Sequence, residues 1–237
     1  MIKSNKDFER KEKIMEKIYT IPVNDAFNVS DGCPFCRMYK TLEDNELDII
    51  LGASMMEPDI RIETNKKGFC REHYEKMFTM KNRLSLALML ESHLDEVIKG
   101  VSGGGLFRDK LTSANDYLSS HADSCYVCDR IENNFGKMIE CAVILWETDE
   151  EFRRKFEKTP YFCIHHYARM LKAASLFVSK KKRSDFYTAA SNIENEYLKT
   201  LKEDVSWFCK KFDYRYDSEP WGNSKDAVER AIKSIYH

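Results

Sequence analysis

Residues 33–36 read Cys-Pro-Phe-Cys, and residues 69–74 read Phe-Cys-Arg-Glu-His-Tyr. Residues 125–128 read Cys-Tyr-Val-Cys, and residues 162–167 read Phe-Cys-Ile-His-His-Tyr. The chain therefore carries Cys-x-x-Cys followed by Cys-x-x-His twice. The first and third cysteines of a copy lie 37 residues apart in one case (33 to 70) and 38 in the other (125 to 163). This matched spacing predicts a tandem duplication.

The spacing within each motif suits the ligation of one metal ion. Residues three apart at a helix start lie on one helix face, so both side chains can reach the same ion. A helix N-terminus also favours thiolate over thiol. We expect each copy to form a Cys3His site that joins its own two helix starts. The predicted ligands are Cys33, Cys36, Cys70 and His73 in the first copy, and Cys125, Cys128, Cys163 and His166 in the second.

Four protein ligands close a site against water and substrate, which indicates a structural ion. We expect two Zn²⁺ ions per chain, with an iron–sulfur cluster as the alternative. His165 and His166 are adjacent, and alignment with His73 favours His166 as the ligand. Cys141 and Cys209 have no counterpart in the other copy, so we expect both in the core.

Composition predicts an all-α protein without nucleic-acid or membrane partners. The 237 residues include only 9 glycines and 5 prolines, 43% are hydrophobic, and the net charge is −1. Few turn residues favour helices over sheets, and a balanced charge gives no drive toward nucleic acid. With no membrane-length apolar run and a polar N-terminus, we expect a cytoplasmic protein.

The glycine-rich residues 100–105 predict a joint between two helical repeats, covering residues 1–100 and 101–237. An N-terminal helix is expected at residues 6–19, and one long helix at residues 70–99.

Two further segments are candidates for ligand binding. In an extended conformation, residues 57–65 would place Glu57, Asp59, Arg61 and Glu63 on one face. The C-terminal stretch alternates aromatic and charged residues, and its Tyr214 and Trp221 could wall a pocket or anchor the tail by burial. For both segments we favour the structural interpretation: a solvated edge at residues 57–65 and an anchored tail.

Several segments along the chain carry a resemblance to a known family: residues 18–24, 33–36, 57–59 with 63–65, 68–70 with His73, and 219–222. Through them the whole chain resembles a family of uncharacterised proteins from anaerobic Gram-positive bacteria, grouped as a domain of unknown function. The resemblance implies metal-ligand roles for the cysteines and histidines of the motifs and implies no activity.

The function that these observations favour is non-enzymatic: a metal-stabilised helical scaffold or interaction module with an unknown protein or small-molecule partner. An enzyme or small-ligand binder at residues 57–65 is one alternative. The other is a redox or metal-responsive regulator that uses the thiolates or an iron–sulfur cluster.

Overall fold

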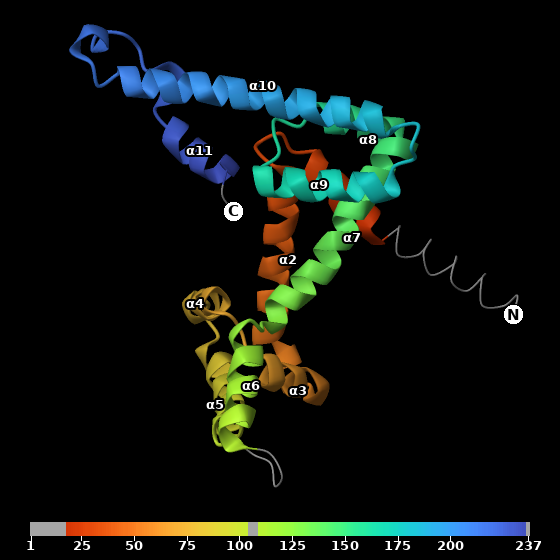
Figure 1. The fold of residues 1–237 in the computed structure, drawn as a ribbon, viewed down its shortest axis with the longest axis vertical. Coiled ribbons are helices and arrows are strands. Elements are labelled where there is room, and N and C mark those ends of the chain that lie inside the picture. The colour runs from red at the N-terminus through yellow and green to blue at the C-terminus, as the bar shows by residue number, and fades with distance from the viewer. Residues whose placement is uncertain (1–17, 104–108, 236–237) are drawn as a thin grey trace, which may run out of the picture. The chain divides into compact units, whose positions relative to one another are not determined.

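The computed structural model describes residues 18–103 and 109–235, and these ranges contain helices and turns without any strand (Figure 1). The prediction of an all-α protein is confirmed. Most of the helix expected at residues 6–19, and part of the glycine-rich segment, lie outside the described ranges. Within these ranges, no helix has the length and apolar character needed to cross a membrane.

The chain divides into two compact units that do not follow the expected halves. Unit 1 combines Met1–Tyr39 with Phe135–His237, and unit 2 is Lys40–Asn134. Both boundaries fall inside long helices, α2 (Pro34–Leu51) and α7 (Tyr126–Thr148). The physical reason is that both motifs of the first copy pair with motifs of the second. Residues 33–36 group with residues 163–166, and residues 70–73 group with residues 125–128.

Unit 1 is built along its longest helix, α10, against which α8, α9 and α11 pack (Figure 1). Residues 18–27 are also helical. The other elements of this unit are α8 (Glu150–Glu157), α9 (Ile164–Phe177), α10 (Arg183–Lys210), the short 3-10 turns η2 (Tyr214–Tyr216) and η3 (Gly222–Ser224), and α11 (Ala227–Ile235).

An aromatic core fills unit 1. Helix α8 shows how it forms, because Phe152 and Phe156 lie four residues apart on one face and are both fully buried. Phe156 lies 5.3 Å from Phe162 between ring centroids, and Phe162 lies 5.8 Å from Phe35. Both ring pairs are tilted, with interplanar angles of 37° and 39°. The core thus reaches the segments that carry Cys33, Cys36 and Cys163.

The C-terminal segment folds onto the end of α10. The ammonium group of Lys211 is buried and donates to the carbonyl oxygens of Tyr216, Asp217 and Glu219 at 2.6, 3.0 and 2.6 Å. The same group lies 5.4 Å from the Trp221 ring. These contacts secure the tail through Lys211, whereas the expected anchoring by burial is wrong for Tyr214, which is 88% exposed.

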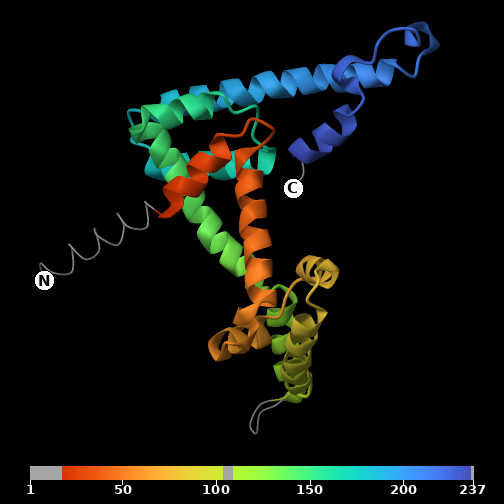
Figure 2. The ribbon, with the colours of Figure 1, turned by 180° about the vertical axis from the view of Figure 1, so that it is seen from behind.

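Unit 2 is organised around α5, which packs against both α3 and α6 (Figure 2). Its elements are the second part of α2, the 3-10 turn η1 (Ala53–Met56), α3 (Pro58–Lys67), α4 (Arg71–Thr79), α5 (Arg83–Val101), α6 (Lys110–Ala122) and the first part of α7. Leu47, Ile50, Met77, Leu86 and Met89 are among its buried apolar residues.

The single long helix predicted at residues 70–99 is wrong, because α4 ends at Thr79 and α5 begins at Arg83. Asn82 makes the break: its side-chain oxygen accepts from the Ser85 amide at 3.3 Å, and its amide nitrogen donates to the Leu51 carbonyl at 2.6 Å. An N-cap of this kind satisfies amides that a helix start leaves unpaired.

The extended conformation predicted for residues 57–65 is also wrong, since Pro58–Lys67 forms α3. Proline at the first helical position and Asp59 in the first turn both favour a helix start.

Candidate metal centres

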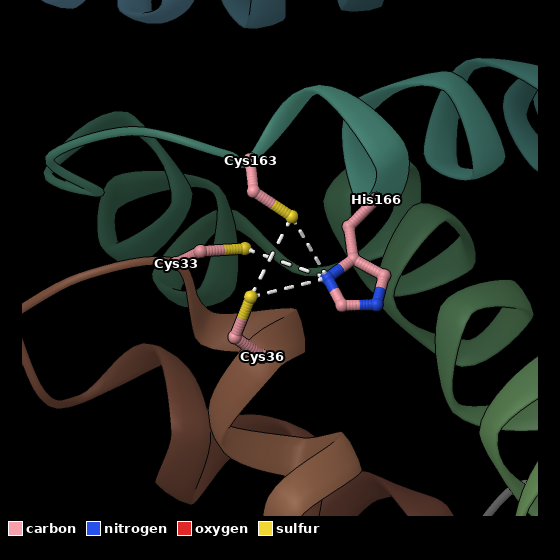
Figure 3. Close-up of side chains that lie close together, drawn as sticks. All are labelled: Cys33, Cys36, Cys163 and His166. Carbon is pink, nitrogen blue, oxygen red and sulfur yellow. Dashed lines mark hydrogen bonds between the residues drawn. The ribbon is translucent and has the colours of Figure 1, made fainter. Parts of the chain in front are cut away.

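The first centre consists of Cys33, Cys36, Cys163 and His166, all in unit 1 (Figure 3). Nδ1 of His166 lies 3.9, 3.3 and 3.1 Å from the sulfurs of Cys33, Cys36 and Cys163, respectively. The sulfurs of Cys36 and Cys163 are 3.5 Å apart. The four side chains converge on one point from two helix starts, as Figure 3 shows.

The second centre consists of Cys70, His73, Cys125 and Cys128, all in unit 2. Nδ1 of His73 lies 3.1 Å from the sulfur of Cys70, 3.3 Å from that of Cys125 and 3.5 Å from that of Cys128. The sulfurs of Cys70 and Cys128 are 3.9 Å apart. The two centres therefore repeat the same arrangement of one imidazole nitrogen against three sulfurs.

Each centre takes its Cys-x-x-Cys from one copy of the motif and its Cys-x-x-His from the other. The expectation that each copy closes its own site is wrong. The four donor atoms that lie within 4.8 Å of one another come, in each group, from both copies of the motif. The two pairings are chemically identical, since both give three sulfurs and one nitrogen. The choice between the two pairings is therefore made by the packing of the helices that carry the motifs.

All four ligand pairs begin a helix, as the spacing predicts. Cys33, Cys70, Cys125 and Cys163 immediately precede α2, α4, α7 and α9. Their carbonyl oxygens accept from the amide four residues on, at distances of 3.3, 3.0, 3.1 and 2.8 Å. The partner ligand three residues later then lies in the first turn, on the same face. In the second centre the Cys128 amide also points at the Cys125 sulfur, at 3.5 Å.

The donor geometry fits a single tetrahedral ion. Bonds of about 2.3 Å to sulfur and about 2.0 Å to nitrogen imply ligand–ligand edges of roughly 3.5–3.8 Å. The four separations given above for each centre, from 3.1 to 3.9 Å, scatter around those edges, and all donor atoms of a centre lie within 4.8 Å of one another. Among the described residues, these are the two groups of histidine, cysteine or carboxylate side chains that could hold a metal ion.

The histidine of the first centre is enclosed by rings. His166 is fully buried, and its ring centroid lies 5.0 Å from that of Phe135 and 6.2 Å from that of Phe35. Tyr39 adds a third ring at 6.4 Å. The neighbouring His165 is exposed and lies outside the group, so the group contains His166 and not its neighbour.

The histidine of the second centre has a charged neighbour instead. Nε2 of His73 lies 3.1 Å from a carboxylate oxygen of Glu43, which is itself buried. The ammonium group of Lys76 lies 2.7 and 2.8 Å from the two oxygens of Glu43, and 2.7 Å from Glu72. Burial nevertheless lowers the pKa of His73, so the neutral ring that a metal needs is favoured.

The pKa values of the three thiols in the first centre are shifted in opposite directions. Burial raises the pKa of Cys33 to about 12, and a hydrogen bond to Cys163 raises that of Cys36. Hydrogen bonds from Cys33 and Cys36 lower the pKa of Cys163. Burial likewise raises the pKa of Cys125 and Cys128 in the second centre. Buried cysteines that resist ionisation individually are thiolates once a cation binds them.

A left-handed glycine makes the turn into the second centre. Gly68 has φ +61°, and an added Cβ would come within 2.7 Å of Nε2 of His93. Its carbonyl oxygen accepts from the Tyr126 amide at 3.0 Å, which joins the segment before Cys70 to the start of α7. Glycine alone tolerates both this backbone geometry and this close approach.

The other predicted site residues do not come together. Glu57, Asp59 and Glu63 are exposed on or beside α3. Arg61 donates to the Leu88 carbonyl and the Ser92 hydroxyl of α5, both at 2.7 Å, so it secures helix packing. Tyr214 is 88% exposed. Trp221 packs against Phe208 and Lys211.

The remaining cysteines differ from each other. Cys141 is buried, as predicted, whereas Cys209 is exposed, because its place on α10 faces away from the core of unit 1. Neither belongs to a Cys/His group.

Sequence reasoning missed the residues that support the ligands. Glu43 and Phe135 each touch a ligating histidine, and Glu194 accepts from the Phe162 amide at 3.0 Å, beside Cys163. One signal was present: Glu43 and Phe135 both lie seven residues after the second cysteine of a Cys-x-x-Cys.

The fold and the two groups define a class: an all-helical protein with two potential metal sites, each of three cysteines and one histidine. The chain belongs to DUF6062, a family of unknown function, whose model matches residues 14–237. The resemblance to a domain of unknown function is thereby confirmed. The comparisons with curated proteins and with solved structures found no match to this chain.

Proposed function

We propose that the protein is a non-enzymatic helical scaffold or interaction module that binds two zinc ions as structural elements. The observation that carries this is the closure of each group, because three sulfurs and one nitrogen within 4.8 Å fill a tetrahedron. Such an ion has no open position for water or substrate. It ties together two motifs whose outermost ligands lie 58 residues apart in one centre (Cys70 to Cys128) and 133 in the other (Cys33 to His166).

The donor set supports zinc over the iron–sulfur alternative. In a cluster, the four ligands are divided among two or four irons, so they do not all meet at one point, as the four donor atoms of each group do here. Sulfurs that approach to 3.5 and 3.9 Å fit one ion. Soft thiolates with an imidazole in tetrahedral geometry favour zinc.

A role in protein contacts is supported by α5. Leu94, Ile98 and Val101 follow each other at helical spacing and are 54, 62 and 52% exposed. Adjacent exposed apolar side chains of this kind are typical of contact surfaces.

The proposal is tested by elemental analysis of protein purified without oxygen. We expect two zinc ions per chain and no visible absorption. Cys163→Ser and Cys128→Ser should each lose one ion, while Cys209→Ser, as the matched control, should keep both. Iron with a brown chromophore, or protein without metal, would contradict the proposal.

A further inference from the structure

Equivalent positions of α2 and α7 support the histidines of the two centres. Glu43 follows Cys36 by seven residues on α2, and Phe135 follows Cys128 by seven residues on α7. Glu43 contacts His73, and Phe135 contacts His166. The same position thus lies beside a histidine in each centre. It is a charged carboxylate, Glu43, in one case and an apolar ring, Phe135, in the other.

The contact of Glu43 reaches the ring nitrogen that does not face the sulfurs. Its oxygen lies 3.1 Å from Nε2 of His73, while Nδ1 lies 3.1–3.5 Å from the three sulfurs. A carboxylate only accepts hydrogen bonds, so Nε2 must carry the proton in this contact. The lone pair of a neutral imidazole is then on Nδ1, aimed at the centre of the sulfur group.

We propose that Glu43 is a positioning residue of the second centre, which fixes the tautomer and the orientation of His73 for metal binding. Lys76 holds the carboxylate through both of its oxygens and is held in turn by Glu72. A carboxylate behind a ligating histidine also increases the basicity of the ring. This inference rests on the proposed function, since it assigns a role toward the same ion.

The competing interpretation is that Glu43 merely forms a buried ion pair. The chain offers a matched control in Glu46, which lies one turn further along α2 and is buried to the same 7% exposed fraction. Its ion pair is with Nε of Arg130 at 2.6 Å, and Arg130 is not a predicted ligand. Both residues therefore share helix, burial and charge pairing, and differ in their contact with His73.

The experiment measures zinc affinity in the full chain by chelator competition, which resolves two dissociation constants. We expect Glu43→Ala to weaken one of them by about 10–100-fold and to leave the other unchanged. Glu43→Gln keeps an acceptor oxygen at the same place, so its loss should be smaller. Glu46→Ala should leave both constants within about twofold. Equal losses for the Glu43 and Glu46 variants would overturn the inference.

A second readout reports the contact between Glu43 and Nε2 of His73 directly. Nitrogen-15 NMR of the zinc-loaded protein should show the Nε2 proton of His73 protected from exchange with solvent, and Glu43→Ala should speed that exchange and shift the Nε2 signal while the His166 signal stays in place. A His73 signal that is unchanged in Glu43→Ala would overturn the inference even if the variant were less stable. If elemental analysis found no zinc in the purified wild-type protein, the proposed function would be overturned instead. The two failures are therefore distinguishable.

Discussion

His73 and His166 hold the same position in the two Cys/His groups but lie in different surroundings. One has a carboxylate and a lysine behind its ring, and the other has three aromatic rings. Polar support depends on a charge network that stays intact, whereas a ring of apolar contacts depends on packing alone. Individual side chains around the ions therefore differ in how they respond to pH and to substitution.

Glu194 gives the clearest pH dependence at this scale. Burial raises the pKa of its carboxyl from the ordinary 4.5 to about 7. A carboxyl with a raised folded-state pKa stabilises the fold while it is protonated in both states, below about pH 4.5, and that contribution is lost as pH rises through about 7. The full loss lowers the free energy of unfolding by about 3 kcal/mol.

We expect Glu194→Gln to remove this loss while keeping an acceptor for the Phe162 amide. With zinc in excess, the urea midpoint of the wild type should fall relative to that of the variant between about pH 5 and pH 8. Glu196→Gln is the control, because Glu196 is exposed on the same helix. Parallel curves for Glu194→Gln and the wild type would contradict the prediction.

At the scale of elements, the structure is a set of helix starts that hold ligands and caps that fix where helices begin. Local signals predict much of this, because the cysteine spacing placed the predicted ligands at helix starts. The break at Asn82 and the helix beginning at Pro58 carried signals too, an N-cap residue and a proline at the first position. At Asn82 the continuous apolar pattern of the segment hides the N-cap signal. At Pro58 the alternation of charged and apolar residues hides the helix start.

The cap of α8 can be tested by substitution. Asp149 accepts from the Glu151 and Phe152 amides at 2.8 and 3.1 Å, and so fixes the helix that buries Phe152 and Phe156. Asp149→Ala should lower the unfolding free energy by about 1 kcal/mol. Asp149→Asn retains an acceptor, so it should cost much less. The measurement is chemical denaturation of the zinc-loaded protein, and an equal cost for both substitutions would argue against capping.

At the scale of the molecule, the sequence could not reveal how the motifs pair. Either pairing supplies three cysteines and one histidine to each ion, so ligand chemistry cannot decide between them. Contacts far apart in sequence decide instead, such as the ring of Phe35 at 6.5 Å from that of Phe135 and 5.8 Å from that of Phe162. Such packing has no local signature in the chain.

Exchange of the motifs predicts the behaviour of a cut chain. A protease site placed at residues 104–108 would separate the two copies of the motif after cleavage. We expect both fragments to elute together from a sizing column with two zinc ions, because each centre draws ligands from both. Chelation under reducing conditions should weaken their association.

A second cut serves as the control. Cleavage at residues 179–182 releases a fragment without predicted ligands, so its retention should respond less to the chelator. If the fragments from the first cut separated and each kept one ion, the exchanged pairing would be refuted.

The nesting of the centres also sets an order of events on the ribosome. All four ligands of the second centre lie between Cys36 and Cys163, and its set is complete once Cys128 has been made. The first centre waits for His166, another 38 residues (128 to 166) and roughly 2–8 seconds of synthesis. Closing its longer loop, 133 residues (Cys33 to His166) against 58 (Cys70 to Cys128), costs only about 0.7 kcal/mol more. The delay in synthesis, more than the cost of closing the loop, therefore makes unit 2 the first part of the nascent chain to fold and unit 1 the last.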